Sequence, residues 1–213
     1  MKKSLIIACD GEAASGKSTG AKLISKKYKL LLINSGLLYR YASKLIIDHN
    51  PKNQIQFLKR KFNKINYKNI TKLNLHNQKI DEHVGPLAKI KSVRLIMQNT
   101  QKKLIKNNNR ICVEGRDIAS NILKKNPKYD LAFYFKCNLN TASYRRWIDI
   151  NKKVPLSEVR KSLITRTRMD KKRKNSPLIR VKDAILIRTD RLSKSKVLAK
   201  MSFYINKIIQ ERN

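Results

Sequence analysis

The chain has 213 residues, of which 41% are hydrophobic, enough for one well-buried core with inserts but not clearly for two full domains. Lys and Arg total 50 against 14 Asp and Glu, a formal net charge of +36, which restricts the expected partners to anions. The lysines are scattered along the whole chain, as expected from a low-GC coding bias. Because only 7% of residues are aromatic and no aromatic and basic strand is interleaved, nucleic acid is not required as a partner.

The start of the chain and its cysteines indicate the compartment. The apolar run over 5–8 is shorter than the roughly 7–15 residues of a secretory signal core. Cys9, Cys112 and Cys137 form no CxxC pair and lie in or beside apolar runs, as buried thiols of a reducing environment do. No apolar run approaches the roughly 20 residues of a membrane helix. We therefore expect a cytoplasmic, monomeric protein with no membrane partner.

Short apolar runs alternate with longer amphipathic segments along the chain. In chain order we predict a strand over 5–9, a helix over 19–28, a strand over 30–33, a helix over 37–47, a polar insert of short helix and small strands over 52–83, a helix over 87–105, strands over 111–113 and 131–135, helices over 141–151 and from Pro155 onward, a strand over 183–187 and a closing helix over 193–210. Strands that alternate with helices predict an α/β fold, here a central five-stranded parallel sheet flanked by helices.

The stretch "GEAASGKS" at 11–18 fits G-x-x-x-x-G-K-[ST] and lies between a predicted buried strand and a predicted helix. Gly11 and Gly16 let the backbone curl so that successive N–H groups face phosphate oxygens, and the helix N-terminus adds its dipole. Lys17 reaches the outer phosphates, and the Ser18 hydroxyl suits Mg²⁺. The stretch therefore predicts a P-loop NTPase fold that binds a nucleoside triphosphate. The residues expected to bind it are Gly11, Glu12, Ala13, Ala14, Ser15, Gly16, Lys17, Ser18 and Thr19.

Two further predicted strands end in a glycine turn with an arginine, at "NSGLLYR" (34–40) and "EGRD" (114–117). Open α/β sheets bind ligands at such strand ends. Late in the chain, "RTRMDKKRKNSPL" (166–178) gathers cations around Asp170. Glu114 is expected to orient Mg²⁺-bound water, with a structural acid as the alternative.

A compact P-loop chain without an N-K-x-D guanine signature favours a kinase that clamps two anionic substrates with arginines. The acceptor would be a small molecule, and UMP, AMP and shikimate are among the alternatives. A basic nucleic-acid-binding P-loop protein is the alternative from another class, and steeply salt-dependent binding would reveal it.

The stretches "DGEAASGKST", "SGLLYR", "VGPLAKIKSVR", "EGRDIAS" and "RMDKKRKNSPL…DAILI" occur in the order and spacing of the bacterial cytidylate kinases, which the chain resembles over nearly its whole length. The resemblance implies phosphorylation of CMP and dCMP with ATP and Mg²⁺. It also implies a core over 1–36, 105–148 and 178–213, a nucleoside-monophosphate-binding insert over about 37–104, and a helical lid over about 149–177.

The resemblance also assigns roles to single residues. The implied CMP-binding residues are Ser35, Arg40, Arg94, Arg116, Asp117, Arg166, Asp170 and Arg173. Within this set, Arg40 and Arg116 would hold the acceptor phosphate, and Arg94 and Asp117 would read the cytosine edge. The groups implied in catalysis are Lys17, Arg116, Arg166 and Arg173. Arg145 or Arg146 would join the lid over ATP.

Plainer interpretations stand beside these roles. In these interpretations the late arginines form a solvated helix face, Asp117 is a helix N-cap, and Ser35 is a turn residue. The chain also departs from the family pattern, with Asn34 in place of Asp, Gly85 in place of a serine that contacts cytosine, and Met169 in place of an arginine. The mechanism expected is direct in-line transfer without a protein nucleophile.

Overall fold

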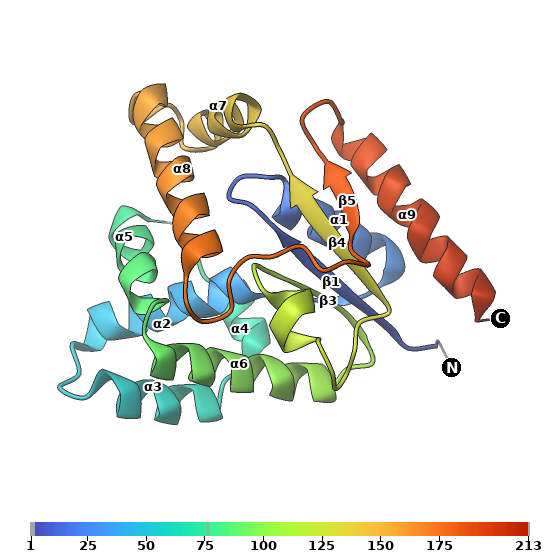
Figure 1. Cartoon of the computed structure of the whole chain (residues 1–213). Coiled ribbons are helices and arrows are strands. Elements are labelled where there is room, and N and C mark those ends of the chain that lie inside the picture. The colour runs from blue at the N-terminus through green and yellow to red at the C-terminus, as the bar shows by residue number, and fades with distance from the viewer. Residues whose placement is uncertain (1–2, 76, 213) are drawn as a thin grey trace. The chain divides into compact units, whose positions relative to one another are not determined.

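The structure is a computed structural model that describes residues 3–75 and 77–212 (Figure 1). The chain divides into two compact units. One unit combines Met1–Ile33 with Asn108–Asn213, and the other is the continuous segment Asn34–Asn107. In the described parts of the chain, no helix is both long and apolar enough to span a bilayer.

The strands form one five-stranded sheet in the order β2-β3-β1-β4-β5. Their bounds are β1 (Leu5–Gly11), β2 (Leu31–Asn34), β3 (Arg110–Gly115), β4 (Leu131–Lys136) and β5 (Ile185–Arg188). β1 pairs in parallel with β3 and β4, and β4 pairs in parallel with β5. Every residue of the central strand β1 is buried, which explains its continuous apolar run. The predicted α/β fold with a parallel sheet is confirmed.

Side chains alternate across β1, so its two faces have different neighbours. Leu5, Ile7 and Cys9 pack with α1 (Lys17–Tyr28) and α9 (Lys194–Glu211) in the main apolar core. Figure 1 shows these two helices side by side along the sheet. On the other face, Asp10 meets η1 (Ile118–Ile122), a single π-helical turn after β3. α7 (Leu139–Asp149) and α8 (Leu156–Lys172) form a hairpin after β4.

From Ser35 to Asn107, all regular structure of the described residues is helical. This segment contains α2 (Ser35–His49), α3 (Gln54–Asn63), α4 (Tyr67–Thr71), α5 (Gln78–Leu87) and α6 (Lys91–Lys106). The first four begin after an asparagine whose side chain accepts a hydrogen bond from the backbone three residues on. These N-caps are Asn34, Asn53, Asn66 and Asn77. Within this unit α2 packs on α5 and α3 packs on α6.

Two predictions for this segment are wrong. The expected small strands over 52–83 are absent from its described residues, where α3, α4 and α5 lie instead. The expected single helix over 87–105 is divided, because α5 ends at Leu87 and α6 begins at Lys91. The backbone of Ile90 between them is extended, with φ −72° and ψ 117°, which stops the helical ladder. The role of this segment as the nucleotide-binding insert remains a prediction.

Candidate active site

The phosphate loop joins the end of β1 to the start of α1. Gly16 has φ +77°, a left-handed conformation that favours glycine. Gly11 is needed for a different reason, since a Cβ there would lie 2.5 Å from the carbonyl oxygen of Phe135 in β4. Thr189, which follows β5, donates its Oγ1 hydroxyl to the Ser15 carbonyl at 2.9 Å and so restrains the loop. The loop therefore has the conformation that its glycines predict.

Lys17, Ser18 and Glu114 form a polar group at the start of α1, in which Lys17 and Glu114 are buried and Ser18 is exposed. Lys17 Nζ and Ser18 Oγ donate to opposite oxygens of the Glu114 carboxylate, at 3.2 and 3.0 Å. Burial lowers the pKa of Lys17, and Arg116 acts in the same direction, whereas Glu114 opposes both. A hydroxyl beside a carboxylate is an oxygen donor set that fits a hard divalent cation. In the described residues, no group of three His, Cys, Asp or Glu side chains could hold a metal by itself.

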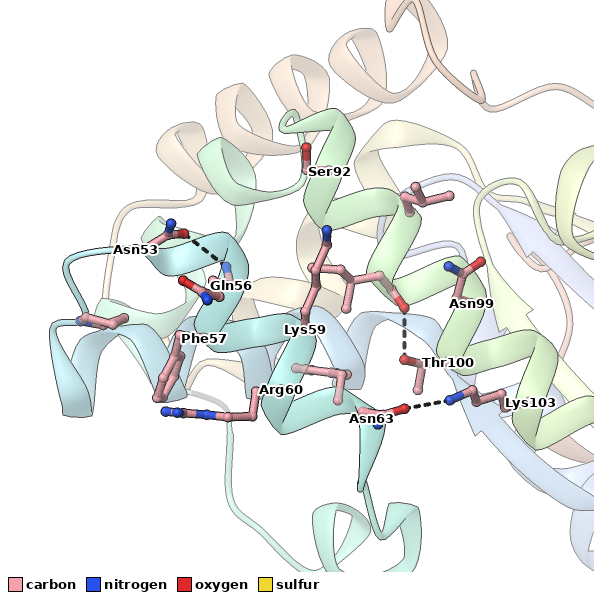
Figure 2. A pocket seen from close by; sticks show the side chains of 14 residues that line it. Asn53, Gln56, Phe57, Lys59, Arg60, Asn63, Ser92, Asn99, Thr100 and Lys103 are labelled. Carbon is pink, nitrogen blue, oxygen red and sulfur yellow. Dashed lines mark hydrogen bonds between the residues drawn. The ribbon is translucent and has the colours of Figure 1, made fainter.

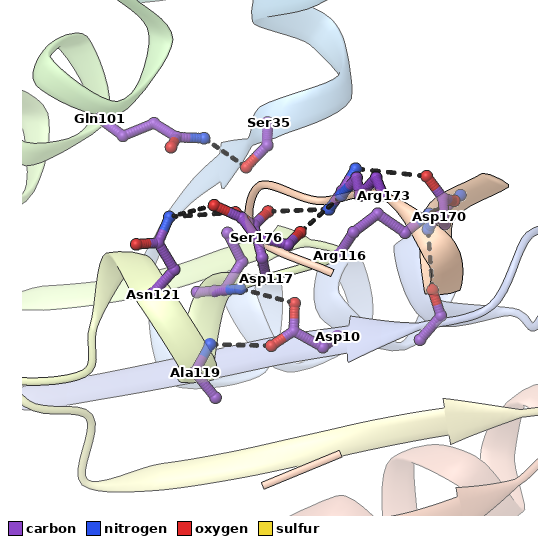
Figure 3. Close-up of polar contacts among 12 residues, drawn as sticks. Asp10, Ser35, Gln101, Arg116, Asp117, Ala119, Asn121, Asp170, Arg173 and Ser176 are labelled. Carbon is purple, nitrogen blue, oxygen red and sulfur yellow. Dashed lines mark hydrogen bonds and ion pairs between the residues drawn. The ribbon is translucent and has the colours of Figure 1, made fainter. Parts of the chain in front are cut away.

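Arg116 lies beside the phosphate loop and contacts it directly. Its Nη1 donates to the Gly11 carbonyl at 2.9 Å, and its Nε donates to Asp170 Oδ2 at 2.8 Å (Figure 3). Arg173 extends the same group, since it pairs with Asp170 at 3.3 Å and with Asp117 at 3.5 Å. One cluster therefore contains two arginines and two carboxylates. Two of these residues follow β3 and two lie at the end of α8, and all four belong to the same unit of the chain.

Asn121 and Ser176 also belong to this cluster, although the sequence did not single them out. Asn121 Nδ2 donates to Asp117 Oδ2 and to Ser176 Oγ, both at 3.1 Å. Arg173 Nε donates to the Ser176 carbonyl. A single asparagine or serine in a turn carries no distinctive local signal, so only the folded contacts identify them.

Asp10 is another functional candidate that the sequence did not single out. Its two carboxylate oxygens accept the backbone N–H groups of Ile118 and Ala119, each at 2.8 Å. Burial raises the pKa of Asp10 to about 6, against the lowering effect of these two hydrogen bonds. The available signal was a carboxylate at the end of a buried strand, directly before the first glycine of the phosphate loop.

The α7–α8 hairpin packs apolar side chains against Ala13 of the phosphate loop and makes two polar contacts with the loop region. Lys171, near the end of α8, pairs with Glu12 of the phosphate loop at 2.7 Å. Arg145 of α7 donates to the Thr189 carbonyl at 2.9 Å. Arg166 lies exposed on α8, one helical turn before Asp170.

The remaining predicted acceptor residues lie in the 34–107 unit. Ser35 is buried and accepts a hydrogen bond from Gln101 of α6, while Arg40 forms an ion pair with Asp81 of α5. Arg94 is only 5% exposed on α6. Asn34, where the family pattern has Asp, caps α2 by accepting the Leu37 N–H at 3.0 Å, a role that asparagine fills as well as aspartate.

The same unit contains a groove of about 860 Å³ between α3 and α6 (Figure 2). Its polar lining includes Lys59, Arg60, Asn63, Asn99 and Lys103, and Lys103 donates to Asn63 at 2.9 Å. None of the residues that the sequence assigned to ATP, metal or CMP lines this groove.

A glycine loop between the central parallel strand and a helix, with a buried lysine, a hydroxyl and a carboxylate beside it, defines a P-loop phosphotransferase. Comparison with known proteins identifies its kind. A family model described as "Cytidylate kinase" matches residues 7–207. The chain belongs to the cytidylate kinase family, whose members use ATP as co-substrate.

Curated relatives agree with this assignment. A cytidylate kinase of Fusobacterium nucleatum is 32% identical over 96% of this chain and 99% of its own length, and one of Rickettsia akari is 31% identical over 97% and 94%. A bifunctional pantoate ligase/cytidylate kinase of Prochlorococcus marinus is 34% identical, and this chain spans 45% of its length.

Among solved structures, an uncharacterized protein from Eubacterium ventriosum aligns with a TM-score of 0.60 at 17% identity, over 95% of this chain and 98% of its own. A shikimate kinase from Bacteroides thetaiotaomicron aligns with a TM-score of 0.51 at 10% identity, with the same coverage. At these identities the likeness concerns the fold alone.

Proposed function

We propose that the chain transfers the γ-phosphate of ATP to CMP or dCMP and produces CDP or dCDP. The observation that carries this proposal is the position of Arg116. Its guanidinium donates to the Gly11 carbonyl of the phosphate loop and to Asp170, a predicted CMP-binding residue. An arginine between a donor site and an acceptor site suits a reaction in which a phosphoryl group passes from one to the other.

On the donor side, the loop amides and Lys17 would hold the phosphates of ATP. Lys17 now pairs with Glu114, and we infer that this contact loosens when Lys17 turns to the outer phosphates. Ser18 would hold Mg²⁺ directly and Glu114 through water, since their oxygens are ligands that this ion prefers. Bound Mg²⁺ would neutralise charge on the β- and γ-phosphates.

On the acceptor side, we assign CMP to the residues that the family pattern implies. Asp117 would accept hydrogen bonds from the 4-amino group of cytosine, which uracil lacks. The arginines at 40, 116 and 173 would bind phosphate oxygens, for which their planar fork is suited. The ion pairs of these arginines, such as Arg116 with Asp170, support this because phosphates can replace carboxylates as arginine partners.

The chemistry needs no protein nucleophile, because the phosphate of CMP is anionic at neutral pH. The chain's contribution is to align the two substrates, neutralise moving charge and exclude water. We infer that the segment at about 149–177, which contains α8, serves as the lid, and the Lys171–Glu12 ion pair supports this because it joins α8 to the phosphate loop. We expect the protein to act in the cytoplasm as a monomer.

The proposal is tested by measuring ATP turnover with CMP, dCMP, UMP, AMP, GMP and shikimate as separate acceptors. We expect turnover with CMP and dCMP far above the other four. Lys17→Ala should abolish turnover and leave the circular dichroism spectrum unchanged. Lys22→Ala, at an exposed position of the same helix, is the matched control and should retain activity. A different preferred acceptor, or an active Lys17→Ala variant, would contradict the proposal.

A further inference from the structure

We propose that Asp10 is a positioning residue for the acceptor site, which holds the turn that carries Arg116 and Asp117. The proposal rests on the proposed function, because it concerns how the CMP-binding side of that same site is held. It assigns a task to the first residue of "DGEAASGKST", which lies outside the phosphate-binding pattern that begins at Gly11.

The carboxylate of Asp10 bridges two separate segments of the chain. It lies near the end of β1, is 2% exposed, and accepts the N–H groups of Ile118 and Ala119 at 2.8 Å, one on each oxygen (Figure 3). Two bonds from one planar group restrain both the position and the rotation of the turn. The Gly11 carbonyl, next along β1, accepts from Arg116. The end of β1 thus holds residues 116–119 at three points.

Asp10 also affects which hydrogen-bond partners the carboxylate of the nearby Asp117 has. Asp117 occupies the N-cap position of η1, where an aspartate side chain commonly accepts the first backbone N–H groups. Here the Asp117 side chain makes no such cap hydrogen bond. Because Asp10 accepts those N–H groups from another strand, the Asp117 carboxylate can turn to Asn121 and Arg173 instead. We infer that this exchange is what presents Asp117 toward a nucleotide base.

The task requires a carboxylate. An asparagine has one acceptor oxygen and one NH₂ donor group, so Asp10→Asn would set a donor against one of the two backbone N–H groups. A buried N–H without an acceptor is unfavourable, and the turn would move to satisfy it. Such a movement displaces Arg116 and Asp117 while the loop over 11–18 retains its own contacts.

The test is steady-state kinetics of Asp10→Asn with Asp130→Asn as the matched control. Asp130 also accepts a backbone N–H of β1, that of Ile6 at 2.6 Å, but at the opposite end of the strand. For Asp10→Asn we expect the KM for CMP to rise about tenfold and the preference for CMP over UMP to fall by a similar factor, as the loss of one charge-assisted hydrogen bond would cause. The KM for ATP should stay within about twofold. Asp130→Asn should alter none of the three.

A second measurement does not depend on the reaction. In the wild type, the Ile118 and Ala119 amides should be protected from hydrogen exchange, and Asp10→Asn should speed their exchange selectively. Rapid exchange of both amides in the wild type would overturn the proposal even if the variant fails to fold. So would equal increases in both KM values, which indicate general damage. A wild type that does not phosphorylate CMP but protects both amides would refute the proposed function and leave the restraint of the turn standing.

Discussion

The side chain of Asp117 has two alternative interpretations: it caps a helix, or it recognises cytosine. Its carboxylate accepts one hydrogen bond from Asn121 at 3.1 Å and pairs with Arg173 at 3.5 Å, and it makes no cap hydrogen bond within η1. The cap interpretation is therefore wrong for the described contacts. A carboxylate held by a neighbouring amide and arginine keeps a defined direction, as base recognition requires.

Replacement of Asp117 should reduce selectivity more than it reduces turnover. We expect Asp117→Ala to lower the ratio of kcat/KM for CMP to that for UMP by about tenfold. The variant loses a hydrogen-bond acceptor for the 4-amino group, which cytosine has and uracil lacks. The measurement is the pair of kcat/KM values. Asn121→Ala removes a partner of Asp117 but keeps its carboxylate, so it should cause a smaller loss. An unchanged ratio in Asp117→Ala would show that another residue reads the base.

Asp10 should give the folding stability an unusual pH dependence. Burial raises its pKa to about 6 in the folded chain, above the ordinary value of 3.8, so the folded state binds this proton more tightly than the unfolded state. The resulting contribution to stability is fully present below pH ~4 and is lost as the pH rises through about 6. Its size is at most about 3 kcal/mol.

Urea unfolding from pH 4 to pH 7 checks this expectation when the wild type is compared with Asp10→Asn. The difference in unfolding free energy, wild type minus variant, should fall as the pH rises across that window, since only Asp10 titrates differently between the two proteins. A difference that stays constant or rises with pH would mean that the folded pKa of Asp10 is not raised.

At the element scale, the strands and the phosphate loop could be predicted from the sequence because their signals are local. A buried parallel strand is a short apolar run, and the loop needs glycines at fixed spacing. The first four helices of the 34–107 unit also have a local signal, an asparagine before the first turn. Asn53, Asn66 and Asn77 each stand three residues before the backbone N–H that their side chains cap, at 3.0, 3.4 and 2.9 Å.

Other features depend on contacts between distant parts of the chain and had no local signal. Arg116 meets Asp170 across 54 residues, and Asp10 meets Ile118 across 108. Family resemblance named Arg116 and Asp170 as neighbours of one substrate, but it did not indicate that they pair with each other. The division between α5 and α6 was missed because the apolar spacing continues through the extended backbone at Ile90.

Gly85 offers a prediction about α5. A Cβ at this position meets no atom within 4 Å, so a larger side chain fits. We expect Gly85→Ser to raise the unfolding free energy by about 0.5 kcal/mol, because serine loses less backbone entropy than glycine in a helix. The family pattern has a cytosine-contacting serine here, so selectivity for CMP over UMP should also increase. Urea unfolding and the ratio of kcat/KM values measure the two effects.

The matched control is Gly20→Ser in α1, also a helical glycine. There a Cβ would lie 2.6 Å from Cζ of the fully buried Phe135 and 3.2 Å from the Met201 sulfur. This variant should lose about 1–3 kcal/mol through overpacking. If Gly85→Ser loses a comparable amount, the open space beside α5 is not available to a side chain.

At the scale of the whole molecule, charge is the dominant feature. With 50 Lys and Arg against 14 Asp and Glu, one-to-one pairing of every carboxylate would still leave 36 cations without an acidic partner. Some of the described ion pairs lie beside the phosphate loop, as at Asp170 and Glu114, and others lie elsewhere, as at Arg212–Asp130. Self-repulsion among the remaining cations disfavours the compact state, and dissolved salt screens it.

Added salt should therefore stabilise the folded chain. Raising sodium chloride from 10 mM to 150 mM shortens the Debye length from roughly 30 Å to roughly 8 Å, which weakens repulsion between separated cations more than it weakens contacts such as Lys17–Glu114. If screening contributes about 1 kcal/mol, the Tm should rise by roughly 2–4 °C. Thermal unfolding at fixed pH measures the shift, and Lys17→Ala is measured beside the wild type to separate screening from anion binding in the phosphate loop. Screening requires an equal shift in both proteins, whereas a rise confined to the wild type would assign the effect to a bound anion. A falling Tm would mean that the ion pairs outweigh the repulsion of the excess cations.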